Sequence, residues 1–115
     1  SAMSVSSGRW TFPSTGYWLV IMNHQSYSSS AQLWGDAIIQ ITTNDSTYND
    51  AAFGSSSYYA SSSFQSSCIM AVVDVTDVTQ VKVSFEVEVA SGDITTTGNT
   101  GNQRTGFTFI RLGDT

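Results

Sequence analysis

Few side chains in this sequence belong to the types that carry catalysis. The chain has one histidine, His24, and one cysteine, Cys68. Acid–base or nucleophilic catalysis needs a base held against a nucleophile, and neither residue has such a partner close by in the sequence. His24 ends an apolar run and begins a polar one, so we interpret it as a surface or interface histidine. Cys68 begins the apolar segment 68–73 and is interpreted as a buried thiol.

Acidic residues offer two further chemistries. Asp74 and Asp77 are three residues apart, and clustered carboxylates are the ligands that calcium prefers. The same spacing is common in turns, where aspartate bonds to the backbone, and we favour that interpretation. Glu86 and Glu88 fall on one face of a predicted strand. They could form the acid pair of a glycan-cleaving enzyme, which needs a separation of ~5–9.5 Å, but we favour a solvated strand face.

Binding is the chemistry that the aromatic residues favour. Trp34, Tyr48, Tyr58 and Tyr59 stand among small polar residues, and we predict that they contact a ligand. Exposed rings stack on sugars while neighbouring amides and carboxylates bind hydroxyls, and Tyr and Trp give large contact areas at low entropic cost. The alternative is that these rings pack beneath a loop or at a subunit interface. No cofactor is predicted, since no His/Cys cluster indicates a metal.

Composition restricts the class of protein. The 115 residues suit one domain, and charged residues make up only 11% of the chain, against about 25% in average domains. The net charge is −5, and the four basic residues form no cluster, which argues against nucleic-acid binding. No apolar run approaches ~20 residues, so no membrane insertion is expected. Residues 1–3 read as an expression-tag remnant and 4–115 as a single domain, with the rest of a longer parent protein on the N-terminal side.

The elements that position these residues are predicted to be strands. Residues 81–89 alternate strictly between apolar and polar, which is typical of a half-buried strand. Residues 17–22 are apolar on both faces, and 107–112 are similar. A strand of this kind must be covered on both sides, and a two-layer sandwich covers only one. Another subunit or a long loop, such as 43–63, must therefore cover the second face.

The remaining pattern is all-β. Further strands are predicted at 9–12, 37–42, about 57–64 and 68–75, with polar loops at 23–30 and across most of 43–63. A turn at 74–77 is expected to join 68–75 and 81–89 as a hairpin. No segment shows a 3.6-residue apolar period, so the sequence indicates a β-sandwich or barrel.

Three segments resemble a known family. Phe12-Pro13 followed by 16–20 resembles the "G-x-Y" strand of complement-type and tumour-necrosis-factor-like jelly rolls. Segment 68–89 looks like their strands E and F, and 105–112 is similar to their last strand. The C-terminus and the Ser/Asn-rich loops look like C-terminal domains of bacteriophage virion proteins, particularly tail fibres or appendages of marine phages.

The resemblance implies a fold and an assembly. The fold is a two-sheet antiparallel jelly-roll sandwich of about 8–10 strands. The family assembles as a homotrimer, whose threefold axis is lined by the sheet that holds the first, "G-x-Y" and last strands. The counterpart of 81–89 also lies in that sheet, whereas here its second face is polar. The interface residues that we predict on this basis are Trp10, Phe12, Tyr17, Leu19, Ile21, Phe107 and Phe109.

The expected function is non-enzymatic. The chain is predicted to be the trimeric head of a phage tail fibre or similar external virion appendage, which mediates trimerisation and recognition of a host-surface glycan or protein. A capsid-decorating or trimerising domain without a receptor is the alternative, and a glycan-degrading enzyme is a third interpretation. The expected location is the virion exterior.

Overall fold

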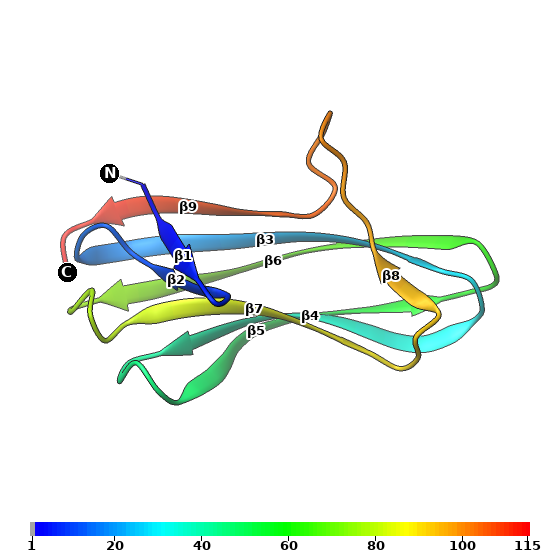
Figure 1. The fold of residues 1–115 in the computed structure, drawn as a ribbon, viewed down its shortest axis with the longest axis horizontal. Coiled ribbons are helices and arrows are strands. Elements are labelled where there is room, and N and C mark those ends of the chain that lie inside the picture. The colour runs from blue at the N-terminus through cyan, green and yellow to red at the C-terminus, as the bar shows by residue number, and fades with distance from the viewer. Residues whose placement is uncertain (1) are drawn as a thin grey trace.

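The fold is an all-β sandwich, as Figure 1 shows for the computed structural model, which describes residues 2–115. Ser1, the first residue of the predicted tag remnant, lies outside the described residues, while Met3 packs against the core. Within this range no helix is long and apolar enough to cross a membrane. The prediction of an all-β jelly roll is confirmed. Residues 2–115 form nine strands: β1 (Ser4–Ser6), β2 (Arg9–Thr11), β3 (Gly16–Ser28), β4 (Gln32–Thr42), β5 (Tyr48–Tyr58), β6 (Ser63–Val75), β7 (Lys82–Val89), β8 (Ile94–Thr96) and β9 (Gly106–Gly113).

The strands form two antiparallel sheets. The large sheet has the order β1-β2-β7-β4-β5. In the small sheet β3 is central: β6 pairs along its whole length on one side, and β8 and β9 lie end to end on the other. The connections β3–β4, β5–β6, β6–β7 and β7–β8 each pass from one sheet to the other, which gives the jelly-roll path.

The predicted hairpin between 68–75 and 81–89 is wrong, because β6 and β7 belong to different sheets. A turn does follow β6, but it lies at 77–81 rather than at the predicted 74–77. The Asp77 carboxylate accepts hydrogen bonds from the backbone and hydroxyl of Thr79, and the amide of Val81 donates to the Asp77 carbonyl. Such a turn reverses the chain, but it does not decide which sheet the next strand joins.

Several strands begin earlier or end later than the sequence predicts. The predicted strand at about 57–64 is wrong, because the turn at 59–62 divides it between β5 and β6. β3 continues to Ser28 through the predicted loop, because His24, Ser26 and Ser28 keep its alternation and point into the sandwich. β5 occupies most of the predicted 43–63 loop. Its small residues fit where the sheets approach closely, since a Cβ added to Gly54 would lie 2.6 Å from Ile69 Cγ2.

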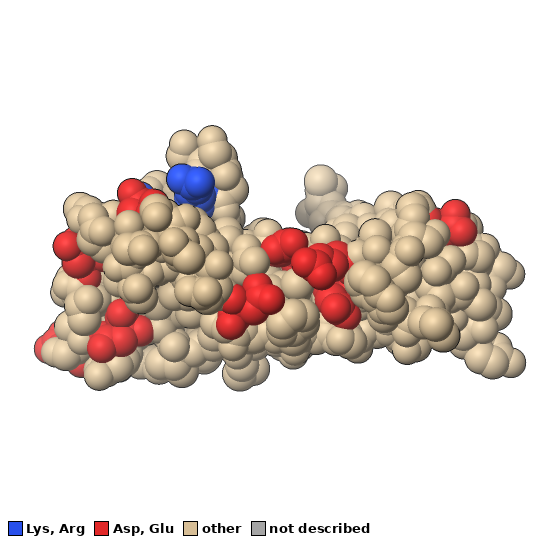
Figure 2. Space-filling model, turned by 90° about the horizontal axis from the view of Figure 1, so that it is seen from below, with Lys and Arg blue, Asp and Glu red and all other residues tan. Residues whose placement is uncertain are grey.

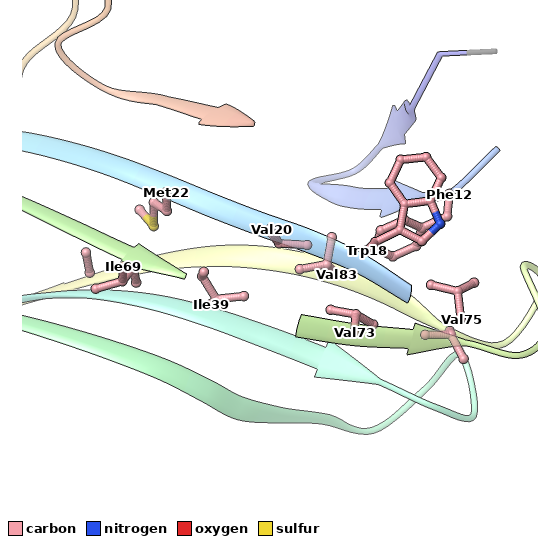
Figure 3. Packing of buried hydrophobic residues seen from close by; sticks show 11 residues of the cluster. Phe12, Trp18, Val20, Met22, Ile39, Ile69, Val73, Val75 and Val83 are labelled. Carbon is pink, nitrogen blue, oxygen red and sulfur yellow. The ribbon is translucent and has the colours of Figure 1, made fainter. Parts of the chain in front are cut away.

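The core lies between the two sheets. Figure 3 shows Val20 and Met22 of β3 near Ile39 of β4, Ile69 of β6 and Val83 of β7. The predicted alternation holds in the first part of β7: Val81, just before the strand, and Val83 are buried, while Lys82 and Glu86 face outward. Val87 and Val89, predicted on the buried face, are each 37% exposed. The resemblance implies that β7 lies in one sheet with β3 and β9. In the structure β7 lies in the large sheet instead. Its polar face is therefore the solvated side of that sheet.

The two ends of the sandwich differ. Both ends of the described chain lie at one end, as Figure 1 shows. The β3–β4, β5–β6 and β7–β8 connections lie at the opposite end, which we call the distal end.

Candidate functional site

The outer surface of the small sheet carries an uncovered group of apolar side chains. On β3, Tyr17, Leu19 and Ile21 point outward, opposite the buried Trp18, Val20 and Met22. On the neighbouring strands, Val72 is 59% exposed, and Met70, Ile110 and Leu112 are also exposed. We call this group the apolar face; its members are Tyr17, Leu19, Ile21, Met70, Val72, Ile110 and Leu112.

Strand register makes the apolar face continuous. Leu19 lies between Val72 of β6 and Ile110 of β9, and the next outward residue, Ile21, pairs with Met70. The predicted alternative cover, segment 43–63, lies mainly in β5 of the large sheet and does not reach this surface. Contiguous exposed apolar patches of this kind mark interaction sites.

The predicted interface residues separate into two groups. Tyr17, Leu19 and Ile21 belong to the apolar face. The other four, Trp10, Phe12, Phe107 and Phe109, belong to an aromatic cluster between the sheets. Phe12 is only 1% exposed, and the ring centroids of Trp10 and Phe109 are 5.1 Å apart. Phe107 stacks on Phe85 of β7 at 3.9 Å, so these four rings join β2 and β9 to the core of their own chain.

The outer surface of the large sheet is acidic instead. Asp36, Asp50, Glu86 and Glu88 come from β4, β5 and β7, and Figure 2 shows acidic side chains gathered midway along the visible surface. A hydrogen bond and like-charge repulsion from Glu86 raise the pKa of Glu88, and Asp50 and Asp36 add to the repulsion. Glu86 and Glu88 thus share one strand face, as the sequence predicts.

The predicted ligand residues are divided between the two ends. Trp34, at the start of β4, and Tyr59, just after β5, are exposed at the distal end, where Leu33 and Phe64 are exposed too. Tyr58 is buried, and its hydroxyl bonds Ser26 inside the sandwich. Tyr48 begins β5 at the opposite end, where the Arg9 guanidinium lies 5.7 Å from its ring centroid. The four residues therefore do not form one site.

The interpretations of His24 and Cys68 are both corrected. His24 is only 4% exposed; its Nε2 lies 2.9 Å from Thr96 Oγ1, and burial lowers the pKa of the imidazole. Cys68 is exposed, because Ile69 takes the inward position on β6. Asn23, not His24, is the cross-strand partner of Cys68. The histidine and the thiol thus lie on opposite faces of the small sheet.

The two aspartates considered for calcium have other partners. Asp74 accepts a hydrogen bond from the Thr115 hydroxyl. Hydrogen bonds from Thr79 lower the pKa of Asp77, which matches the predicted turn role. Among residues 2–115, no group of three or more His, Cys, Asp or Glu side chains is placed to hold a metal ion.

A polar pocket that the sequence did not reveal adjoins the apolar face. Its volume is about 340 Å³, and it is lined by residues 23–25 of β3, 66–68 of β6, and Gln103 and Arg104 before β9. The three segments are far apart in the sequence, and each reads locally as polar loop or strand. No periodic signal marks them as one site, because only the pairing of β3 with β6 and β9 brings them together.

No protein-family model and no curated protein matches this chain. Function is therefore inferred from the surfaces described above.

Proposed function

We propose that the chain is a non-enzymatic, self-associating head domain, which forms a homotrimer at the end of a phage tail fibre or similar external virion appendage and contacts the host surface. The apolar face is the observation that carries this proposal. Side chains such as Val72 and Leu112 lie open on one side of a packed sheet. Covering them removes apolar surface from water, which is the main driving force for association.

Charge favours other copies of the same chain as the cover. Identical subunits with a net charge of −5 repel one another unless their acidic groups stay apart. None of the seven residues of the apolar face is charged, and the cluster around Glu88 lies on the opposite sheet. Association through the apolar face therefore keeps the acidic clusters on the outside of the assembly.

The number of copies follows from the resemblance. In tumour-necrosis-factor-like jelly rolls the sheet that holds the "G-x-Y" and last strands lines the threefold axis, and here β3 and β9 share the small sheet. The predicted first strand, β2, is in the large sheet instead. Three copies meeting at the small sheets are the arrangement that this chain supports best.

Recognition is assigned to the distal end. Tyr59 is 92% exposed and Leu33 87% exposed there, beside Trp34. Three copies would present these side chains together, so that weak contacts gain from high effective concentration. Alanine at Trp34 and Tyr59 together is expected to reduce binding to host cells at least tenfold without changing the oligomer. Unchanged binding would leave only a structural, trimerising role.

Oligomeric mass tests the central claim. Light scattering after size exclusion should give three times the mass of one chain for the wild type. Val72→Asp places a carboxylate on the apolar face of every copy, and like charges brought together in an interface cost several kcal/mol, which corresponds to about a 100-fold weaker association. Val5→Asp is the matched control, because Val5 on β1 is similarly exposed, at 52%, but lies outside the apolar face. A monomeric wild type, or equal effects of both variants, would refute self-association through this face.

A further inference from the structure

The polar pocket beside the apolar face has the dimensions and lining of a ligand site. Its volume of about 340 Å³ falls within the ~300–1,000 Å³ usual for small-molecule sites. Its floor lies on two paired strands, with Asn23 opposite Cys68 and Gln25 opposite Ser66. A floor of paired strands holds its side chains in fixed positions, which favours specific binding.

The lining is rich in groups that bind hydroxyls. Asn23, Gln25 and Gln103 carry amides, which offer both donors and acceptors, and Ser66 adds a hydroxyl. The Gln25 side chain is held by Thr97, whose hydroxyl donates to Gln25 Oε1 at 2.9 Å, so the amide NH₂ group is left as a donor. The backbone N–H of Gln25 donates a hydrogen bond to Thr105 Oγ1 at 3.1 Å, which fixes the same segment.

Arg104 gives the pocket a positive charge in a chain that is acidic overall. Its Nε donates to Asn102 Oδ1 at 3.3 Å, and among the described residues it forms no ion pair. No Asp or Glu lines the pocket. A smaller pocket, lined in part by Arg9 and Lys82, differs because it contains a carboxylate, that of Asp45, which lies 2.7 Å from Lys82. A guanidinium with free donors is the side chain best suited to bind a carboxylate in a bidentate manner.

We infer that this pocket binds a saccharide unit that carries a carboxylate, such as a uronic or sialic acid, with Arg104 on the carboxylate and the amides on the ring hydroxyls. The inference rests on the proposed recognition function and gives it a ligand class and a second contact site, apart from the distal end. The pocket and the apolar face share the outer surface of the small sheet but no residue, so binding and association can be tested separately.

The test compares acidic sugars with their neutral counterparts. Glucuronate, galacturonate and N-acetylneuraminate are paired with glucose, galactose and the methyl ester of N-acetylneuraminic acid. Binding is followed by the amide NMR signals of 23–25 and 66–68. Cys68 supplies a second readout, since it is the chain's one thiol and lines the pocket. A bound sugar should slow its alkylation by iodoacetamide. At least one acidic sugar is expected to bind about tenfold or more tightly than its neutral partner, as charge-assisted hydrogen bonds allow.

Two variants make the result specific. Arg104→Gln should abolish the preference for the acidic sugar, and Arg9→Gln, which removes one positive charge outside the pocket, should leave it unchanged. Equal binding of neutral and acidic sugars would overturn the inference, as would the absence of any pocket signal with all three acids. Light scattering of Arg104→Gln should give the wild-type mass, so a failure of sugar binding is distinguishable from a failure of self-association.

Discussion

Both sheets have aliphatic side chains that point outward, away from the core, but these side chains are buried to different degrees. In the large sheet, 37–39 of β4 are apolar on both faces. Ala37 and Ile39 point into the core, and Ile38 points outward, yet Ile38 is only 1% exposed. Its cross-strand partners are Phe53 of β5 and Glu86 of β7, whose long side chains can lie over it.

In the small sheet the cover is only partial, and Leu19 and Ile21 are half-buried. The neighbours of Leu19 are Val72 and Ile110, and the β6 partner of Ile21 is Met70; all three neighbours are exposed themselves. Val72 and Ile110 are too short to fold over Leu19, and Met70, which is long enough, is itself 55% exposed. The comparison teaches that an outward-pointing apolar residue is buried within its own chain only when long side chains on the neighbouring strands lie over it. Otherwise it stays at least partly exposed.

The largest expected effect is a difference in the free energy of unfolding between two alanine variants, one at Ile38 and one at Leu19. Ile38→Ala removes a fully buried side chain and should lower the free energy of unfolding by about 2–5 kcal/mol at every protein concentration. Leu19→Ala should cost about 1 kcal/mol at protein concentrations low enough to dissociate the proposed oligomer. It should cost more when the chain is concentrated enough to associate.

Urea denaturation at two protein concentrations checks this pair. If Leu19→Ala were as costly as Ile38→Ala in dilute solution, the apolar face would already be covered within one chain, and the contrast between the sheets would be lost.

A smaller effect is expected on the acidic surface, where Glu88 has a pKa above its ordinary value of 4.5. A raised pKa means that the folded state favours the protonated form, so the stability present below pH 4.5 is lost as the pH rises through the folded-state pKa. Glu88→Gln removes this loss. The variant should therefore melt above the wild type at pH 7, and this difference should shrink at about pH 3.5.

Asp77 provides a control of opposite sign. Its pKa lies below the ordinary 3.8, so its carboxylate adds stability as the pH rises. Asp77→Asn should accordingly melt below the wild type at pH 7 and approach it in acid. Melting curves of both variants across this pH range test the two directions together. If both variants shifted the melting temperature in the same direction at pH 7, the opposite pKa shifts of Glu88 and Asp77 would be contradicted.

The local pattern of apolar and polar residues was sufficient to predict some of the strands. Strict alternation in 81–89 and two-sided apolar character in 17–22 identify strands, because both signals lie within a few neighbouring residues. The second half of β3 gave no such signal. His24 and Ser26 are buried there and bond to side chains distant in the sequence, Thr96 at 72 residues from His24 and Tyr58 at 32 residues from Ser26. Tertiary hydrogen bonds of this kind leave no trace in a hydrophobicity pattern.

The surfaces were predictable to different degrees. The sequence alone indicates that residues 17–22 are apolar on both faces. Only the structure shows which of the two faces the chain itself leaves open. Aromatic type alone could not separate the exposed Tyr59 from its buried neighbour Tyr58, since the end of a strand falls between them. The polar pocket could not be predicted, because Arg104 meets Cys68 only after three segments have paired.

The position of β9 has a consequence for synthesis of the chain. Ile110 and Leu112 complete the apolar face, and β3, which begins at Gly16, stays without a partner along that edge until β9 pairs with it. Domains generally fold as units once their segments are available. The apolar face is therefore complete only after β9 has emerged from the ribosome and paired with β3.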